Sequence, residues 1–152
     1  MSIESVAAYF EKHNLHFDIK EFDDSTENVE KAAVALGVEP ALIAKTLAFR
    51  DSDAGILIVM KGDARVDNRK FKEQFKIKPT MLKPKEVEEI TGHPVGGVCP
   101  FGLAREIRIF VDESLKQFKK VYPAAGSRNS CIEIAPDELC RITGAEWVNV
   151  CK

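Results

Sequence analysis

The chain has 152 residues, of which 45% are hydrophobic and 30% are charged, a composition typical of a globular protein. This length predicts one domain, residues 1–152, with a buried core. The formal net charge of -2 argues against a protein that coats nucleic acid through charge alone, although it leaves room for a local basic patch. The longest apolar run, residues 56–60, is much shorter than a membrane span of roughly 20 residues. We therefore expect no membrane association, and the N-terminus shows no secretory signal, so we expect a cytoplasmic protein.

The cysteines and histidines show no metal-binding pattern. The four cysteines form no C-x-x-C pair, and the three histidines are not clustered with them. We therefore predict neither a metal site nor a cofactor. A nucleophilic cysteine would need a nearby base and a lowered pKa, and the sequence indicates neither for Cys99. Small buried or half-buried thiols are the expected state of Cys131, Cys140 and Cys151.

The first third of the chain predicts a helix, a strand and a second helix. Apolar residues at helical spacing favour a helix over residues 3–13, and the period-two alternation of residues 16–22 favours a strand. Residues 24–26 offer caps for a helix that continues through Leu36 and ends at Gly37.

The middle of the chain predicts a hairpin followed by two short helices. Strands are expected at residues 43–50 and 56–61, with a turn at residues 51–55 between them. Helices are expected at residues 67–75 and 83–91. The second helix is expected to end at residue 91, because the following residue, Gly92, is suited to end a helix.

The last third predicts more strands than helices. Strands are expected at residues 107–112, 120–123, 131–134 and 147–150, with a helical turn at residues 113–119 and a helix at residues 136–142. Hairpin-like spacing of the strands favours an α+β fold over a parallel βαβ array. We therefore predict a mostly antiparallel, barrel-like mixed sheet surrounded by helices.

Lys45 is the first candidate functional residue, because its neighbours in residues 42–49 are apolar and indicate an internal strand. An unpaired buried ammonium is costly, so the side chain must either reach solvent or meet an anion. The sequence leaves both possibilities open. If Lys45 binds a ligand, a phosphate or a polarised carbonyl is the natural partner, and Thr46 adds a hydroxyl.

Residues 92–102 contain four glycines and two prolines. Such a loop can turn its N–H groups toward a ligand, or it can be a purely structural turn. No G-x-x-x-x-G-K-[ST] or G-x-G-x-x-G pattern occurs, so we do not expect a nucleotide cofactor. We expect His93, beside a proline, to lie at the surface.

Two further segments have alternative interpretations. Residues 124–130 carry Ser127, Arg128 and Ser130, and they either line the same pocket or form a polar turn. Basic residues are crowded between positions 61 and 85, where they form either a solvated helix face or a surface that binds phosphates.

With these residues in view, the sequence resembles the YbaK family of aminoacyl-tRNA deacylases, which is related to the inserted editing domain of bacterial prolyl-tRNA synthetases. The resemblance covers nearly the whole chain. It rests on the Lys45-Thr46-Leu47 segment, on Gly96 and Pro100 as the ends of a G-x-x-x-P loop, and on residues 122–126 leading into residues 132–139.

The resemblance implies a hydrolase that removes a mischarged small amino acid from tRNA, on Cys-tRNA(Pro) or Ala-tRNA(Pro). Lys45 would be the catalytic residue and would anchor the terminal adenosine or its phosphate. Residues 96–100 would hold the aminoacyl group. The implied substrate-binding residues are Phe22, Thr46, Gly96, Gly97, Val98, Pro100, Ala124, Gly126 and Ser127.

The sequence departs from the cysteinyl-tRNA branch of the family at two positions. Ala124 stands where that branch has a serine, and Phe22 replaces a tyrosine, so two hydroxyls are missing. Thr46 is nevertheless more like the cysteinyl branch than the alanyl branch. A non-catalytic module that binds an amino acid or aminoacyl-tRNA is the alternative function. The expected partners are the aminoacylated 3′ end of tRNA and a prolyl-tRNA synthetase, with the protein itself a monomer or homodimer.

Overall fold

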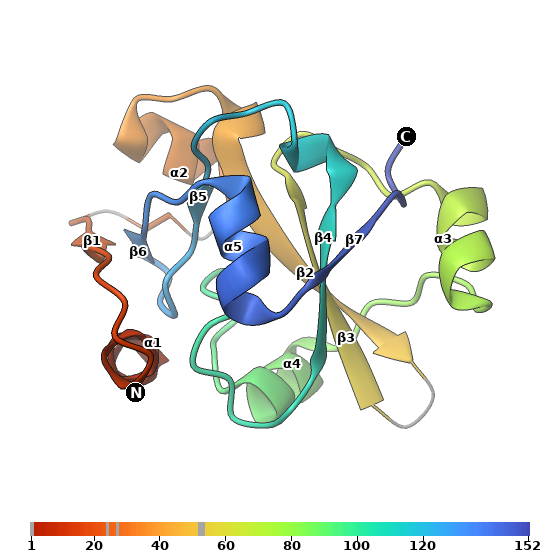
Figure 1. Cartoon of the computed structure of the whole chain (residues 1–152), viewed down its shortest axis with the longest axis horizontal. Coiled ribbons are helices and arrows are strands. Elements are labelled where there is room, and N and C mark those ends of the chain that lie inside the picture. The colour runs from red at the N-terminus through yellow and green to blue at the C-terminus, as the bar shows by residue number, and fades with distance from the viewer. Residues whose placement is uncertain (1, 24, 27, 52–53) are drawn as a thin grey trace.

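The computed structural model describes residues 2–23, 25–26, 28–51 and 54–152, and its centre is a five-stranded sheet (Figure 1). The strands are β5 (Tyr122–Pro123), β2 (Ile43–Asp51), β3 (Ala54–Lys61), β4 (Arg108–Asp112) and β7 (Glu146–Val148), in that spatial order. A second sheet pairs β1 (Lys20–Glu21) with β6 (Ser130–Cys131).

The predicted α+β fold with a mixed sheet is confirmed by the directions of the strands. The longest ladder, β2 with β3, is antiparallel from Ala44 opposite Lys61 to Asp51 opposite Ala54. The β1–β6 pair is also antiparallel. The three shorter ladders, β2–β5, β3–β4 and β4–β7, are parallel. Parallel pairing arises because helical and loop segments, rather than tight turns, connect these strands along the chain.

In the described part of the chain, five α-helices surround the sheets. They are α1 (Ser2–Lys12), α2 (Val29–Leu36), α3 (Asn68–Phe75), α4 (Pro84–Thr91) and α5 (Pro136–Thr143), and two 3-10 turns cover Pro40–Leu42 and Glu113–Leu115. Helices α1 and α3 lie at opposite ends of the molecule (Figure 1). Within the described residues, no helix combines the length and the apolar character that crossing a membrane requires.

Helix α2 begins later than its sequence suggests. Its cap is Asn28, whose side-chain oxygen accepts a hydrogen bond from the Lys31 N–H at 2.8 Å. The predicted caps Ser25 and Thr26 instead donate to the Arg128 carbonyl, and Asp24 lies outside the described residues. Gly37 ends the helix in a left-handed conformation with φ of 69°, as predicted.

The predicted strand at residues 16–22 is reduced to the two residues of β1. The alternation is real, because Leu15, Phe17 and Ile19 pack against the main hydrophobic cluster while the residues between them are exposed. A strand, however, also needs a partner backbone, and β6 offers only two residues. The predicted turn at residues 51–55 includes positions 52 and 53, which lie outside the described residues.

Strand β3 forms the centre of the core, since the side chains of residues 56–60 are at most 1% exposed. On one face of the sheet, Val59 belongs to a cluster that also contains Phe101 and Leu139. On the other face, Ile58 and Met60 pack in a cluster with aromatic rings, among them those of Phe49, Phe71 and Phe110. Apolar burial on both faces explains why this strand has no polar alternation.

Gly62 allows its own backbone to lie very close to the backbone at the start of β2. A Cβ atom at this position would lie 2.0 Å from the Pro40 oxygen, 2.8 Å from the Ile43 oxygen and 2.9 Å from Val29 Cγ1. The two oxygens belong to the backbone, so they cannot move without shifting the 3-10 turn at Pro40–Leu42 or the start of β2.

We expect Gly62→Ala to lower the free energy of unfolding by about 1–3 kcal/mol or more, because the added methyl group has no room at this close contact. Gly144→Ala is the matched control. Gly144 has a φ of 70° with no atom within 4 Å of its Cβ position, so its substitution costs only backbone strain, about 1 kcal/mol. Urea unfolding of both variants measures the difference. A smaller loss at position 62 than at position 144 would contradict the described packing.

Candidate functional site

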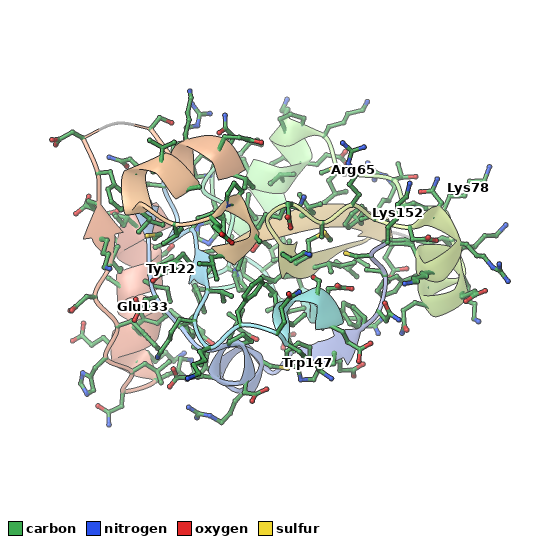
Figure 2. All side chains as sticks on the ribbon, turned by 90° about the horizontal axis from the view of Figure 1, so that it is seen from above. Arg65, Lys78, Tyr122, Glu133, Trp147 and Lys152 are labelled. Atoms are coloured by element: carbon green, nitrogen blue, oxygen red, sulfur yellow. The ribbon has the colours of Figure 1, made fainter. Side chains whose placement is uncertain are left out.

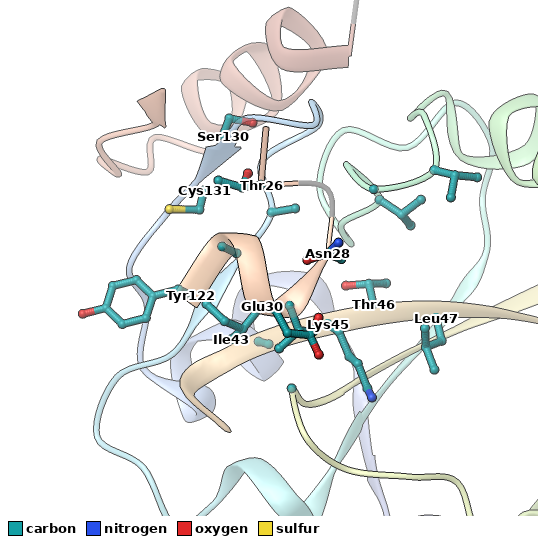
Figure 3. Close-up of a pocket in the computed structure, with 18 of the residues that line it drawn as sticks. Thr26, Asn28, Glu30, Ile43, Lys45, Thr46, Leu47, Tyr122, Ser130 and Cys131 are labelled. Atoms are coloured by element: carbon teal, nitrogen blue, oxygen red, sulfur yellow. The ribbon is translucent and has the colours of Figure 1, made fainter. Parts of the chain in front are cut away.

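A cavity of about 550 Å³ lies between α2, β2, the start of α4 and the loops at residues 92–102 and 124–131 (Figure 3). This volume is in the range of small-molecule sites. The predicted site residues that line it are Phe22, Lys45, Thr46, Gly96, Val98 and Ala124. Lys45 and the glycine-rich loop, which are about fifty residues apart in the sequence, therefore meet at one cavity.

The cavity occupies a gap along the outer edge of β2. Strand β5 pairs only with Ile43 and Ala44. Farther along, the Ala48 carbonyl accepts a hydrogen bond from Leu82 N–H at 3.0 Å, and Arg50 N–H donates to Thr80 O at 2.8 Å. Between β5 and the segment at residues 80–82, the edge of β2 faces the cavity.

Backbone alternation places the polar groups of Thr46 at this open edge. Residues two apart in a strand direct their N–H and C=O groups to the same side, and those of Ala48 and Arg50 point away from β3. The N–H and C=O of Thr46 therefore point toward the cavity. Within the described residues, no backbone hydrogen bond from outside the sheet reaches Thr46.

The Thr46 side chain adds a third polar group to this gap. Its hydroxyl is buried and has no hydrogen-bond partner among the described residues. The neighbours on the same face, Ala44 and Ala48, pack into two different hydrophobic clusters, so Thr46 lies between them. Figure 3 shows Thr46 on the side of β2 that faces Thr26 and Asn28. An unpaired buried hydroxyl costs stability, which makes it a candidate ligand contact.

Lys45 projects from the opposite face of β2 (Figure 3). It is half-buried, and its ammonium group donates to the Ala64 carbonyl at 2.6 Å. The side chain thus meets a neutral carbonyl, which neither sequence alternative anticipated. Burial lowers the pKa of Lys45 from 10.5, while the carboxylates of Asp63 and Glu30 oppose the shift. Two of the three ammonium donors remain for other partners.

The remaining predicted residues lie behind the cavity wall and hold its loops together. Gly126 N–H donates to Gly97 O at 3.1 Å, and a Cβ atom on Gly97 would lie 2.7 Å from the Ser127 backbone. Ser127 Oγ donates to Ser130 Oγ at 2.7 Å. Pro100 is buried. These contacts give Gly97, Pro100, Gly126 and Ser127 a structural position next to the site.

The loop at residues 124–130 is also fastened to two other walls of the cavity. Arg128 Nε donates to Val95 O at 3.1 Å, which connects it to the glycine-rich loop. On the other side, Asn129 Nδ2 donates to Phe22 O at 2.7 Å, and Phe22 N–H donates to Asn129 O at 2.8 Å. The three segments therefore form one hydrogen-bonded wall around the opening.

His93 is buried, so its predicted surface position is wrong. Its ring nitrogen Nε2 lies 2.7 Å from the Phe101 carbonyl, which assigns the proton to Nε2 in the neutral ring. Burial lowers the pKa of His93 from 6.5. The loop folds back over the histidine, and a neighbouring proline does not reveal this burial. His93 is thus a structural pin inside the loop rather than a base in the cavity.

The thiols in and near the cavity are not activated. Burial raises the pKa of Cys99 to about 12 and that of Cys131, which lines the cavity, to about 11. Both remain protonated at neutral pH, so neither is suited to be a nucleophile. Among the described residues, no group of three His, Cys, Asp or Glu side chains is placed to hold a metal ion.

Sequence reasoning missed part of the lining. Thr26, Asn28 and Glu30 reach the cavity from the start of α2, and Tyr122 reaches it from β5. The sequence places the helix cap at residues 24–26, so it points neither to Asn28 as the cap nor to its neighbours in space. Met81 lines the cavity from the segment at residues 80–82, which pairs with β2. No local pattern in these residues reveals that they share one opening.

Protonation of His93 should destabilise the protein. Because the folded pKa lies below 6.5, the unfolded chain binds the proton more tightly, so the free energy of unfolding falls as the pH drops through 6.5 toward the folded pKa. Urea unfolding between about pH 7.5 and 5 measures this slope. His93→Gln should flatten the profile, since the variant differs from wild type only at this histidine. Identical slopes for wild type and His93→Gln would contradict the assignment of this pH dependence to His93.

Comparison with known proteins places these features in a family. Residues 23–142 match the family described as "Aminoacyl-tRNA editing domain". The chain is 49% identical to the Bacillus subtilis protein YwhH, with 100% of this chain and 98% of that protein covered. It is 28% identical to EbsC of Enterococcus faecalis, named as a candidate Cys-tRNA(Pro)/Cys-tRNA(Cys) deacylase, with 92% of this chain and 88% of EbsC covered.

A solved structure shares the fold. It is described as a candidate trans-editing enzyme for prolyl tRNA synthetase, and it matches with a TM-score of 0.91 and 29% identity over 99% of this chain and 97% of that one. An editing domain of this family hydrolyses the ester bond of an aminoacyl-tRNA. The matched residues include the whole of β2, α4 and the glycine-rich loop. The chain therefore belongs to the aminoacyl-tRNA editing domain family.

Proposed function

We propose that this protein is a free-standing deacylase that removes a mischarged small amino acid, cysteine or alanine, from tRNA(Pro). The observation that carries the proposal is the unpaired edge of β2 at Thr46 inside a mainly apolar cavity, with Lys45 beside it. Residues 1–152 would act as one editing unit in the cytoplasm, where a prolyl-tRNA synthetase supplies the mischarged tRNA.

The cavity has the composition that an aminoacyl-adenosine end requires. Apolar side chains such as Ile43, Leu47 and Val98 exclude water, while the N–H, C=O and hydroxyl of Thr46 provide fixed donors and acceptors. Its volume of about 550 Å³ leaves room for a nucleoside with a small amino acid attached. A site with few polar groups at defined positions selects its ligand by the geometry of the ligand rather than by its charge.

The chemistry needs positioning more than a protein nucleophile. A water molecule attacks the ester carbonyl carbon, the carbonyl oxygen becomes an oxyanion, and the bond to the ribose oxygen then breaks. The ribose oxygen takes a proton, which yields the free amino acid and the tRNA. An N–H or hydroxyl aimed at the oxyanion stabilises the transition state, and Thr46 offers both. The protonated thiols of the cavity are not required.

Lys45 has a separate role in this proposal. The contact with Ala64 O uses one donor and holds the ammonium group on the face of β2 opposite Thr46. The remaining donors would bind the phosphate or ribose of the terminal adenosine, because an ammonium binds phosphate as a point charge. A cation at this position would thereby orient the ester relative to Thr46.

The identity of the amino acid on the mischarged tRNA is the more specific part of the proposal. The name of EbsC favours cysteine, and Thr46 after Lys45 resembles the cysteinyl branch. The hydroxyl groups missing at Phe22 and Ala124 would leave an apolar surface next to Cys131, which suits a thiol or a methyl side chain. We therefore place Cys-tRNA(Pro) first and Ala-tRNA(Pro) second.

Lys45→Ala should reduce kcat/KM for deacylation of the preferred tRNA on the order of a hundredfold, the usual effect of removing one positioned donor. The measurement is release of labelled amino acid from a panel of mischarged tRNAs, with folding checked by urea unfolding. Lys12→Ala on α1, at a distance from the cavity, is the control and should retain full activity. Equal rates for wild type and Lys45→Ala would exclude the role of Lys45.

Thr46→Val separates a functional hydroxyl from a structural one. The Thr46 hydroxyl has no partner, so its loss should leave the free energy of unfolding unchanged or raise it by about 1 kcal/mol, while kcat/KM falls on the order of tenfold. Thr91→Val is the matched control. Its hydroxyl donates to Val87 O at 2.7 Å, so its loss should destabilise by about 1–3 kcal/mol.

Urea unfolding and the deacylation assay together decide the role of Thr46. A Thr46→Val variant that loses stability as Thr91→Val does, but keeps full activity, would show that the hydroxyl serves the fold alone.

A further inference from the structure

The positive charge of the chain is concentrated in one segment. Residues 61–78 contain seven Lys and Arg against three Asp and Glu, which gives them a net charge of +4 in a chain whose total is -2. This segment includes the end of β3, the loop to α3, α3 itself and the residues that follow it. Such an asymmetry indicates a binding surface for an anionic partner.

The acids of this segment are already occupied. Asp63 lies 3.5 Å from the Lys61 ammonium, and Glu73 lies 3.2 Å from Arg69. Asp67 caps α3 by accepting from Lys70 N–H at 3.0 Å. The charge of Asp67 also acts on Lys70 and Lys152, whereas Arg65 and Lys78 have no ion pair with these three acids among the described residues.

Several cations remain exposed with no ion pair among the described residues. We call three of them, Arg65, Lys78 and Lys152, the basic strip. Lys152 N–H donates to the Arg65 carbonyl at 2.9 Å, so these two residues are neighbours. Figure 2 shows Arg65, Lys152 and Lys78 at the surface toward the same end of the molecule, beside α3.

The basic strip lies next to the residue that the Lys45 side chain contacts. The Lys45 ammonium contacts the carbonyl of Ala64, the residue directly before Arg65. From Lys45 the positive charge therefore continues to Arg65 and Lys152. At the other end of the cavity, Tyr122 donates to a carboxylate oxygen of Glu133 at 2.9 Å, and Figure 2 shows this pair away from the basic strip. A phosphate chain that leaves the cavity is attracted toward the strip and repelled from Glu133.

We propose that the basic strip binds the sugar–phosphate backbone of the tRNA acceptor end whose aminoacylated tip occupies the cavity. This inference rests on the proposed function, since it extends the same site along its substrate. Phosphate contacts of exposed Lys and Arg side chains fix the position of a nucleic acid without reading its sequence. The strip therefore contributes affinity and orientation, while the cavity selects the amino acid.

Lys70 has a different role, although it lies in the same segment. Its ammonium donates to the Cys151 carbonyl at 2.8 Å and to Asn149 Oδ1 at 3.4 Å, so it fastens the end of the chain to α3. Removal of Lys70 would disturb the fold and the strip together. A test of phosphate binding must therefore use the cations that make no such contact.

The test compares two double variants with the same loss of charge. Arg65→Gln/Lys78→Gln removes two cations of the basic strip, and Lys12→Gln/Lys119→Gln removes two exposed lysines outside it. Each variant is assayed on full-length aminoacyl-tRNA and on a 3′-O-aminoacyl adenosine, which has no phosphate chain. Binding of uncharged tRNA is measured in parallel over a range of salt concentrations.

The strip variant should lose affinity for tRNA on the order of tenfold, and its plot of log affinity against log salt should be shallower by about two units. Its hydrolysis of aminoacyl adenosine should equal that of wild type. The control variant should match wild type within about twofold on both substrates. Equal affinity and equal salt slope for the strip and control variants would overturn the proposal.

The two substrates separate this inference from the proposed function. If wild type hydrolyses neither substrate, the proposed function fails, whereas the salt dependence of tRNA binding still decides the basic strip. If the strip variant loses hydrolysis of aminoacyl adenosine as well, its substitutions disturb the cavity, and the separate role of the strip is contradicted.

Discussion

The open edge of β2 is the constraint on which the site depends. A strand edge with free N–H and C=O groups is normally paired or covered, since it can pair with other chains and its unpaired groups cost stability when buried. Here β5 covers the edge as far as Ala44, and residues 80–82 cover it again from Ala48. The gap of one backbone repeat at Thr46 is small enough to keep other strands out and wide enough to take a ligand group.

The rest of the molecule keeps that gap open. Strand β3 buries both of its faces and holds β2 rigidly from the inside. Opposite the gap, the glycine-rich loop is internally pinned by His93 and is fastened to residues 124–130 by Gly97, Gly126 and Arg128. Each of these hydrogen bonds uses at least one backbone group, which explains how short, irregular segments can hold a defined shape. Burial of Thr46 without a partner is a stability cost that this frame supports.

Much of this architecture could be predicted from the sequence, because strong local signals determine it. The apolar run of β3 and the helix ends at Gly37 and Gly92 follow such local patterns. The meeting of Lys45 with the glycine-rich loop is expected from the family resemblance, since no local pattern joins two segments about fifty residues apart. The burial of His93 could not be predicted, since it depends on the way the loop folds back to place the Phe101 carbonyl against the ring. The contact of Lys45 with Ala64 could not be predicted either, since Ala64 lies beyond the next strand. The shortening of β1 has the same origin, because periodicity reports burial and does not report the length of the partner strand.

The central claim is that the acylated end of a tRNA binds to the open edge of β2 at Thr46. NMR spectroscopy of the labelled protein, titrated with an aminoacyl adenosine analogue whose ester is replaced by a stable amide, tests this claim most directly. We predict that the Thr46 amide shifts and becomes protected from hydrogen exchange on binding, together with a change at the Lys45 ammonium. Saturable binding that leaves the Thr46 amide unshifted and freely exchanging would contradict the account.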